Sequence, residues 1–130
     1  MADLSITLRG FHEIPRVLGD FLGGYTLSGE RGEPYRGRTQ SVLKKSFLQN
    51  EKLEISISKI NDSISALINE WGGAERIATA IRRFGVEFVH IEIHFCREEI
   101  NELSGFQVEN RILNLTSKID SSLGISWSSN

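Results

Sequence analysis

The stretch 86-VEFVHIEIHFCREE-99 decides the fold of this chain, because it alternates apolar and polar residues over the longest run in the sequence. The apolar residues of this run share one face of an extended strand: Val89, Ile91, Ile93 and Phe95. The polar residues share the opposite face: His90, Glu92, His94 and Cys96. The stretch therefore predicts a half-buried strand at the centre of a sheet.

Other stretches show the same period of two and predict further strands. The run 4-LSITLRG-10 alternates strictly, 52-KLEISISKI-60 alternates clearly, and 41-SVLKKSFLQN-50 alternates weakly. We expect a turn at residues 50–52 between the last two. The closing run 125-ISWSS-129 predicts a short final strand.

Apolar residues spaced three and four apart predict three or four amphipathic helices. These cover residues 14–22, 62–84 and 107–123, and the pair Gly72-Gly73 either separates two helices within the middle range or breaks one. Pro15 suits the first turn of the first helix, and Asp62 is the expected N-cap of the second. The final helix is expected to end at Gly124.

Both tryptophans continue an apolar periodicity, which predicts that they belong to the core. Trp71 lies on the apolar stripe of a helix, whereas Trp127 shares an apolar strand face with Ile125. Tryptophan is also enriched at binding hot spots, but the periodicity already explains these two residues.

The alternating strands need a cover for their apolar faces, and the amphipathic helices supply it. This predicts an α+β fold with a single domain over residues 1–130. It is a two-layer sandwich, in which a mostly antiparallel sheet of about four to five strands carries three to four helices on one face. The other face is then polar, and we expect it to carry Ser5, Thr7, Arg9, Glu54, Ser56, Ser58, His90, Glu92, His94, Ser126 and Ser128.

The amino-acid composition limits which classes of function are expected. The 130 residues carry 15 basic and 17 acidic side chains, a formal charge of -2, so nucleic acid is not an expected partner. The single cysteine excludes an internal disulfide and every multi-cysteine metal centre. The N-terminus has neither a signal peptide pattern nor a membrane anchor, which predicts a soluble, cytoplasmic protein without a membrane partner.

The glycine-rich stretch 28-SGERGEPYRGRTQ-40 raises the question of a phosphate loop. It lacks the Lys-Ser/Thr pair before a helix that such loops need, and its glutamates partly neutralise its arginines. A solvated connector is the preferred interpretation, with a protein-contact loop second and a phosphate or nucleic-acid site third. If the stretch contacts a protein or a phosphate group, Arg36, Arg38, Lys44 and Lys45 would form its basic patch.

The group His90, Glu92 and His94 is the candidate ligand-binding site, because alternate residues of a strand point the same way. Zinc enzymes use three such ligands, but His90 and His94 are four residues apart and so lie roughly 13 Å from each other along a strand, which disfavours a single metal. We therefore expect no metal or other cofactor and prefer a solvated or partner-facing strip. Cys96 lacks a neighbouring base and orienting group, so no catalytic residue is expected.

The run 97-REEINELSG-105 is rich in carboxylates. Glu98, Glu99 and Glu102 predict an acidic surface patch rather than paired hydrolytic acids, which need a cleft. Such a patch would attract a basic protein partner through electrostatic steering.

Several short motifs resemble a family of small bacterial proteins known only as a domain of unknown function. They are the order of 4-LSITLRG-10 and 17-VLGDFLG-23, the basic-Gly-Glu motif Arg31-Gly32-Glu33, the pair Gly105-Phe106 before the last helix and the pair Leu123-Gly124 before the closing strand. The resemblance covers most of the chain and carries no established activity. Small bacterial families of this size often act as immunity proteins that block a toxin domain, so the resemblance implies such a role by analogy.

The leading expectation is therefore a non-enzymatic protein-binding module, an immunity protein that neutralises a cognate toxin. Its expected partner-binding residues are Glu98, Glu99 and Glu102, with Arg36 and Arg38 second. The alternative is a small-ligand or metal-binding domain that uses His90, Glu92 and His94 on the polar sheet face, and that could be an enzyme of unknown type.

Overall fold

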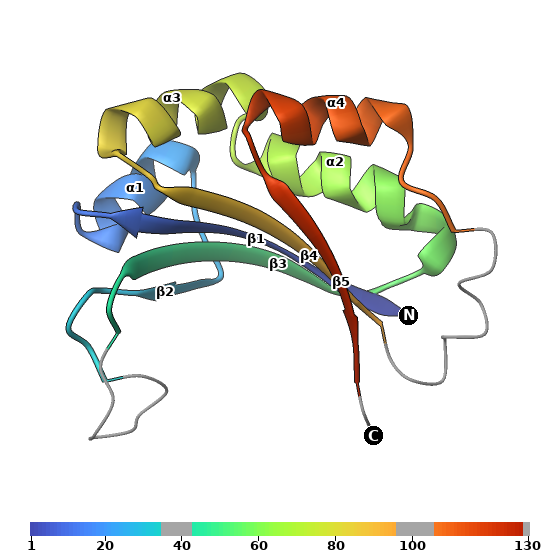
Figure 1. The fold of residues 1–130 in the computed structure, drawn as a ribbon, viewed down its shortest axis with the longest axis horizontal. Coiled ribbons are helices and arrows are strands. Elements are labelled where there is room, and N and C mark those ends of the chain that lie inside the picture. The colour runs from blue at the N-terminus through green and yellow to red at the C-terminus, as the bar shows by residue number, and fades with distance from the viewer. Residues whose placement is uncertain (35–42, 96–105, 129–130) are drawn as a thin grey trace.

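The computed structural model describes residues 1–34, 43–95 and 106–128 (Figure 1). The described part has an α+β fold with a mixed five-stranded sheet and four α-helices. The strands are β1 (Ala2–Phe11), β2 (Leu27–Gly29), β3 (Ser46–Ile55), β4 (Phe88–Phe95) and β5 (Ser122–Trp127). The helices are α1 (Pro15–Leu22), a 3-10 turn η2 (Ile57–Lys59), α2 (Ile60–Glu70), α3 (Ala74–Phe84) and α4 (Asn110–Lys118). None of these helices is long and apolar enough to cross a membrane.

The strand order is β2-β3-β1-β4-β5. β1 pairs antiparallel with both β3 and β4, β2 pairs antiparallel with β3, and β4 pairs parallel with β5. The expected two-layer α+β architecture is confirmed. β4 was expected at the centre of the sheet. It is an interior strand, because β5 pairs with its outer side, but the central strand is β1, which has two strands on either side.

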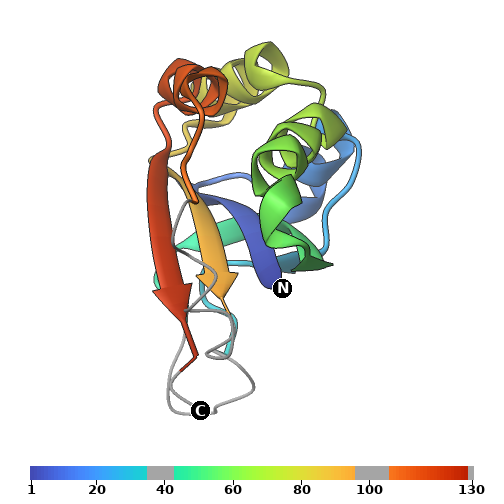
Figure 2. The same cartoon turned by 90° about the vertical axis from the view of Figure 1, so that its right-hand side faces the viewer.

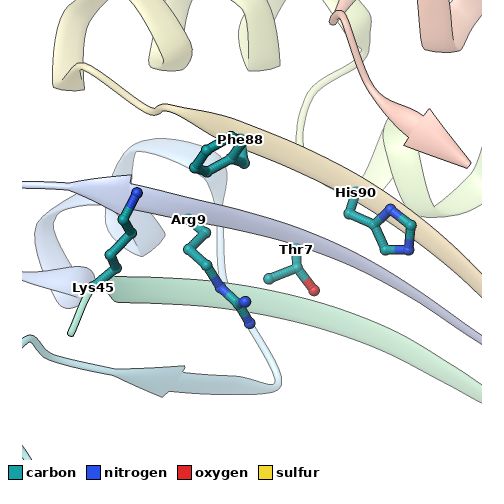
Figure 3. A pocket seen from close by; sticks show the side chains of 5 residues that line it. All are labelled: Thr7, Arg9, Lys45, Phe88 and His90. Carbon is teal, nitrogen blue, oxygen red and sulfur yellow. The ribbon is translucent and has the colours of Figure 1, made fainter. Parts of the chain in front are cut away.

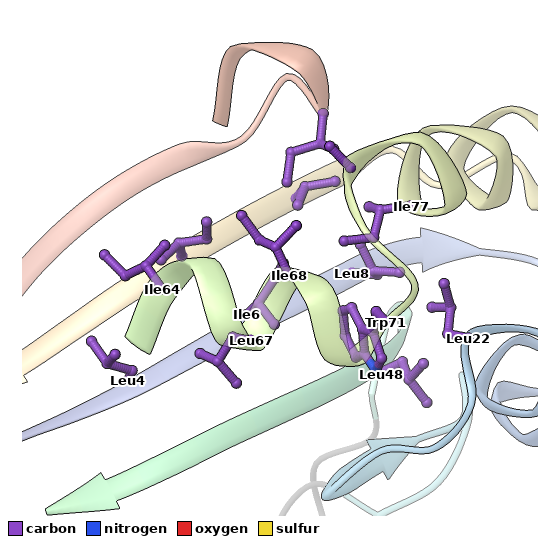
Figure 4. Close-up of a cluster of buried hydrophobic side chains, with 14 of the residues drawn as sticks. Leu4, Ile6, Leu8, Leu22, Leu48, Ile64, Leu67, Ile68, Trp71 and Ile77 are labelled. Carbon is purple, nitrogen blue, oxygen red and sulfur yellow. The ribbon is translucent and has the colours of Figure 1, made fainter. Parts of the chain in front are cut away.

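The helices lie on one side of the sheet, and the hydrophobic core fills the space between the two layers (Figures 1 and 2). The side chains that alternate inward from β1, Leu4, Ile6 and Leu8, are at most 1% exposed. Figure 4 shows them along β1 beneath α2, with Leu4 near Ile64 and Leu8 near Trp71. Complete burial of one such aliphatic side chain stabilises the fold by about 1.5–3 kcal/mol.

Trp71 is a core residue, as its helical spacing predicts. It is 1% exposed, and its indole Nε1 donates a hydrogen bond of 2.7 Å to the carbonyl oxygen of Gly24. Since Gly24 follows α1 and Trp71 follows α2, this bond ties the ends of two helices together. The indole thus supplies both apolar area and a satisfied polar group.

The expected turn at residues 50–52 was wrong, because β3 runs without interruption from Ser46 to Ile55. Asn50 pairs with Ile6 of β1, and its side chain bonds to Thr26 and Glu70. Asn50 and Lys52, two of the residues that suggested a turn, therefore bond to Glu70 of the helix layer. Ser56 and Ser58, expected on the polar face of the sheet, lie beyond the end of β3 in and beside the 3-10 turn.

The helix ends also differ from expectation. α2 begins at Ile60, so Asp62 lies in its first turn instead of capping it. α4 ends at Lys118, six residues before Gly124, because Asp120 adopts a left-handed conformation with φ 50°. The amide of Ser121 then donates to Thr116 O, which closes the helix and frees the chain to start β5.

Ile125 and Trp127 were expected in the core. The prediction that they are buried is wrong, although the predicted face of the strand is correct. They pair with Ile93 and Phe95, so they lie on the helix side of the sheet. Their exposed fractions are nevertheless 48% and 57%. β5 is an edge strand whose C-terminal half runs away from the helix layer (Figure 2), so no described helix covers it.

Candidate functional site

The sheet face that points away from the helices, called the open face below, carries the candidate site. Cross-strand register arranges its side chains in rows. The first row crosses four strands and contains Gly29, Phe47, Arg9 and Phe88. The second contains Leu27, Gln49, Thr7, His90 and Ser122. The third contains Glu51, Ser5, Glu92 and Gly124.

These rows divide the open face into a basic and an acidic end. Arg9 lies in the first row, and Lys45 directly precedes β3 beside it. Glu51 and Glu92 lie in the third row, and Asp3 follows on β1, opposite His94. The face therefore carries charged residues that are sorted along the strands, but Phe47, Phe88 and Leu27 add apolar side chains that were not expected there.

A pocket of about 400 Å³ opens at the basic end of this face. Five side chains from β1, β4 and the segment before β3 line it: Thr7, Arg9, Lys45, Phe88 and His90 (Figure 3). Phe88 is 56% exposed, which is a large apolar area for an aromatic ring outside the core. The pocket therefore combines two cations with an aromatic surface.

Lys45 has two partners at the pocket rim. Its ammonium group forms an ion pair with Glu87 and lies 4.6 Å from the centre of the Phe88 ring, within cation-π range. The hydrogen bond and charge of Lys45 lower the pKa of the Glu87 carboxyl. Gly10 makes this arrangement possible, since a Cβ at Gly10 would lie only 2.8 Å from Cβ of Glu87.

The Arg9 side chain differs from that of Lys45 in having no hydrogen bond or ion pair to any residue that the structure describes. Its side chain is exposed, between Phe47 and Phe88 in the first row. The guanidinium group therefore offers its donors to a partner.

His90 is held by hydrogen bonds at both ring nitrogens. Nδ1 lies 2.6 Å from the Ser122 hydroxyl, and Nε2 lies 2.8 Å from Oε1 of Glu92. Because a carboxylate only accepts, Nε2 carries a proton and donates to Glu92. Gly124 leaves room for this pair, since a Cβ there would overlap Glu92 Oε1 and lie 2.9 Å from the imidazole.

His94 repeats the arrangement further along β4. Its Nδ1 lies 2.8 Å from the Ser126 hydroxyl, and its Nε2 lies 2.9 Å from the Ser128 hydroxyl. His90, Glu92 and His94 thus share a face, as predicted. The ring nitrogens of the two histidines are already hydrogen-bonded, to serine hydroxyls on and after β5 and, for His90, to Glu92. Within residues 1–34, 43–95 and 106–128, no three His, Cys, Asp or Glu side chains are grouped to hold a metal ion.

The other predicted site residues lie outside the described residues: Arg36, Arg38, Glu98, Glu99 and Glu102. Cys96, which was not expected to be catalytic, lies there too. Their assignments stay predictions. Sequence reasoning missed Phe88, although it is two residues before His90 and so shares its face. It also missed Phe47, Gln49 and Glu51, because the assumed turn at residues 50–52 hid the alternation of β3.

Neither a protein-family model, nor a curated protein, nor a solved structure matches this chain. The geometry of the open face is therefore the basis on which a function is proposed.

Proposed function

We propose that this chain is a non-enzymatic protein-binding module, an immunity protein that neutralises a cognate toxin by covering its active site. The observation that carries the proposal is the open face of the sheet, which no described helix covers (Figure 2). It exposes Phe88 by 56%, directly across from the charged side chain of Arg9, and Leu27 by 50% on the outer strand β2. Exposed aromatic and arginine side chains together are typical of binding hot spots.

The rigidity of the open face supports a binding role. His90 and His94 are each held at both ring nitrogens, and Thr7 Oγ1 donates to Gln49 Oε1 at 3.0 Å. Side chains that are already ordered lose little conformational entropy when a partner binds. A pre-organised sheet surface suits a folded protein better than a flexible substrate.

The charges of the face indicate how a partner would be oriented. Glu51, Glu92 and Asp3 form an acidic end, and the predicted patch Glu98, Glu99 and Glu102 follows β4 in the chain. A basic region of a toxin would approach this end by electrostatic steering. Arg36 and Arg38 remain a second predicted contact for an acidic region.

The alternative function is a small-ligand or metal-binding domain around His90, Glu92 and His94. The pocket beside His90 favours a small ligand. The occupied ring nitrogens speak against a metal, because a metal would have to displace the serine hydroxyls and Glu92.

A tagged pull-down from cells of the source organism tests the proposal. We expect a stoichiometric protein that co-purifies with the chain, and a substitution Phe88→Asp should abolish its capture while Arg82→Glu, on α3 in the helix layer, leaves it intact. Metal and small molecules are assayed in the same samples. A bound metal or small molecule without a protein, or equal capture by Phe88→Asp, would reject the immunity role.

A growth assay then separates neutralisation from mere binding. The captured protein is expressed in a heterologous host with and without this chain. Rescue of growth by the wild-type chain, but not by Phe88→Asp, is the expected result.

A further inference from the structure

We propose that the pocket at the basic end of the open face is a carboxylate-binding site, which receives an acidic side chain of the partner protein. Arg9 is the principal cation of this site and Lys45 the second. The proposal rests on the protein-binding function for the identity of the partner, but the chemistry of the site is argued from the pocket itself.

Arg9 is the group that lacks a partner at this site. Its guanidinium carries five N–H donors in a planar fork, and none of them bonds to a described residue. Phe47 and Phe88 flank it in the same row of the sheet. Aromatic neighbours exclude water from one side of an ion pair, which strengthens a bidentate contact with a carboxylate.

Lys45 already binds a carboxylate at the rim of the pocket. Its ammonium group pairs with Glu87 and lies over the ring of Phe88. The side chains of this ion pair are 42% and 46% exposed, so an incoming carboxylate can share or replace Glu87. The Lys45–Glu87 ion pair therefore shows that a carboxylate can reach Lys45, as a carboxylate of the partner would.

The remaining lining groups select an anion over a neutral polar ligand. The hydroxyl hydrogen of Thr7 is donated to Gln49, and both nitrogens of His90 are engaged by Ser122 and Glu92. Among the described lining groups, the free hydrogen-bond donors are therefore those of the cations. A pocket of about 400 Å³ has room for one acidic side chain with its backbone.

The surrounding charges favour a single carboxylate over a nucleic-acid backbone. Nucleic-acid binders place many cations along the phosphate track. Here Glu87 borders the two cations, Glu51 and Glu92 lie further along the same face, and the chain carries a net charge of -2. A long phosphate backbone that runs along the face would meet these carboxylates, whereas a short acidic segment can enter at the basic end.

NMR titration of the isotope-labelled chain tests the site with a capped oligo-glutamate peptide at low salt. The expected result is that amide signals of Thr7, Arg9, Lys45, Phe88 and His90 shift, whereas a capped oligo-glutamine peptide of equal length shifts none of them. Arg9→Gln should weaken peptide binding by about three- to tenfold, and the double variant with Lys45→Gln should weaken it further. The matched control Arg82→Gln on α3 should bind like the wild type.

Three outcomes overturn the site: no shift with oligo-glutamate, equal shifts with oligo-glutamine, or unchanged affinity in Arg9→Gln. Single-stranded DNA of the same charge and inorganic phosphate form the other arms. Tighter binding of either one through Arg9 would replace the carboxylate by a phosphate ligand.

The same variants separate this proposal from the proposed function. A partner captured equally by wild type and Arg9→Gln would reject the carboxylate site and leave the protein-binding role. A peptide that binds through Arg9 while no protein is ever captured would keep the site and reject the immunity role.

Discussion

Gly124 shows how a single residue shapes the open face. Its missing side chain leaves the space in which Glu92 and His90 meet above β5. At Gly10, with φ +91°, the absence of a side chain likewise makes room for Glu87. Both glycines thus leave room for a carboxylate side chain: Gly124 for Glu92 on β4, and Gly10 for Glu87 just before β4.

We expect Gly124→Ala to break the His90–Glu92 hydrogen bond, because the new Cβ would overlap Glu92 Oε1. The overlapping atom ends a flexible side chain, so the sheet should persist and the free energy of unfolding should fall by about 1 kcal/mol. Urea denaturation measures the loss, and the NMR signal of the His90 imidazole reports the bond. An unchanged imidazole signal would contradict this account.

The Lys45–Glu87 ion pair should depend on pH in a defined direction. Lys45 lowers the pKa of Glu87 in the folded protein, so the pair stabilises the fold above the ordinary pKa of a glutamate. Its contribution should be lost as the pH falls through the folded-state pKa. A double-mutant cycle with Lys45→Met and Glu87→Gln should show a small coupling at neutral pH and none in acid. Coupling that grows in acid would refute the pairing.

At the scale of elements, an irregularity in β3 sets the outer end of the sheet. Ala2 pairs with Ile55 but Leu4 pairs with Lys52, so β3 holds one more residue than β1 between these pairs. Glu54 absorbs the extra residue with φ 55°, and its amide donates to Asp3 Oδ1 at 2.9 Å. This is a β-bulge that bends β3 before the chain enters the 3-10 turn.

Glu54→Gly should stabilise the protein by up to about 1 kcal/mol, because glycine adopts a left-handed conformation without the steric cost of a Cβ. Glu54→Ile should destabilise it, since a branched side chain tolerates this conformation least. Thermal unfolding of both variants against wild type checks the order. Equal melting temperatures for the two variants would mean that residue 54 leaves this conformation in solution.

The whole molecule is organised by one sheet and one described core. β1, β3, β4 and the helices contribute to a single cluster of buried side chains. β5, by contrast, leaves Ile125 and Trp127 exposed at the edge. The two tryptophans of the chain therefore report on different places, one inside the core and one at its margin.

A single core predicts cooperative unfolding. The variant Trp127→Phe leaves Trp71 as the only fluorophore of its kind, and its own effect on stability should stay within about 0.5 kcal/mol because Trp127 is largely exposed. We expect the urea midpoint from Trp71 fluorescence to coincide with that from far-UV circular dichroism. Separate midpoints would divide the chain into more than one folding unit.

The sequence by itself determined the layers of this protein. Strict alternation in β1 and β4 and helical spacing in α2 and α3 depend on local geometry, so these elements and their buried faces could be predicted from residues alone. The shared face of His90, Glu92 and His94 followed from the same period of two. The burial of Trp71 followed from the stripe of α2.

Only the tertiary structure decided which strands are neighbours and what their side chains meet. Asn50 is typical of a turn in the sequence, but in the structure its side chain bonds to Thr26 and Glu70. Trp127 has the spacing of a core residue, but it is exposed because β5 is an edge strand. The pocket likewise depends on cross-strand register, which brings Arg9 between Phe47 and Phe88 from distant parts of the chain. Local periodicity specifies the face on which a side chain lies, but contacts between distant strands specify its neighbours, and it is the neighbours that make a binding site.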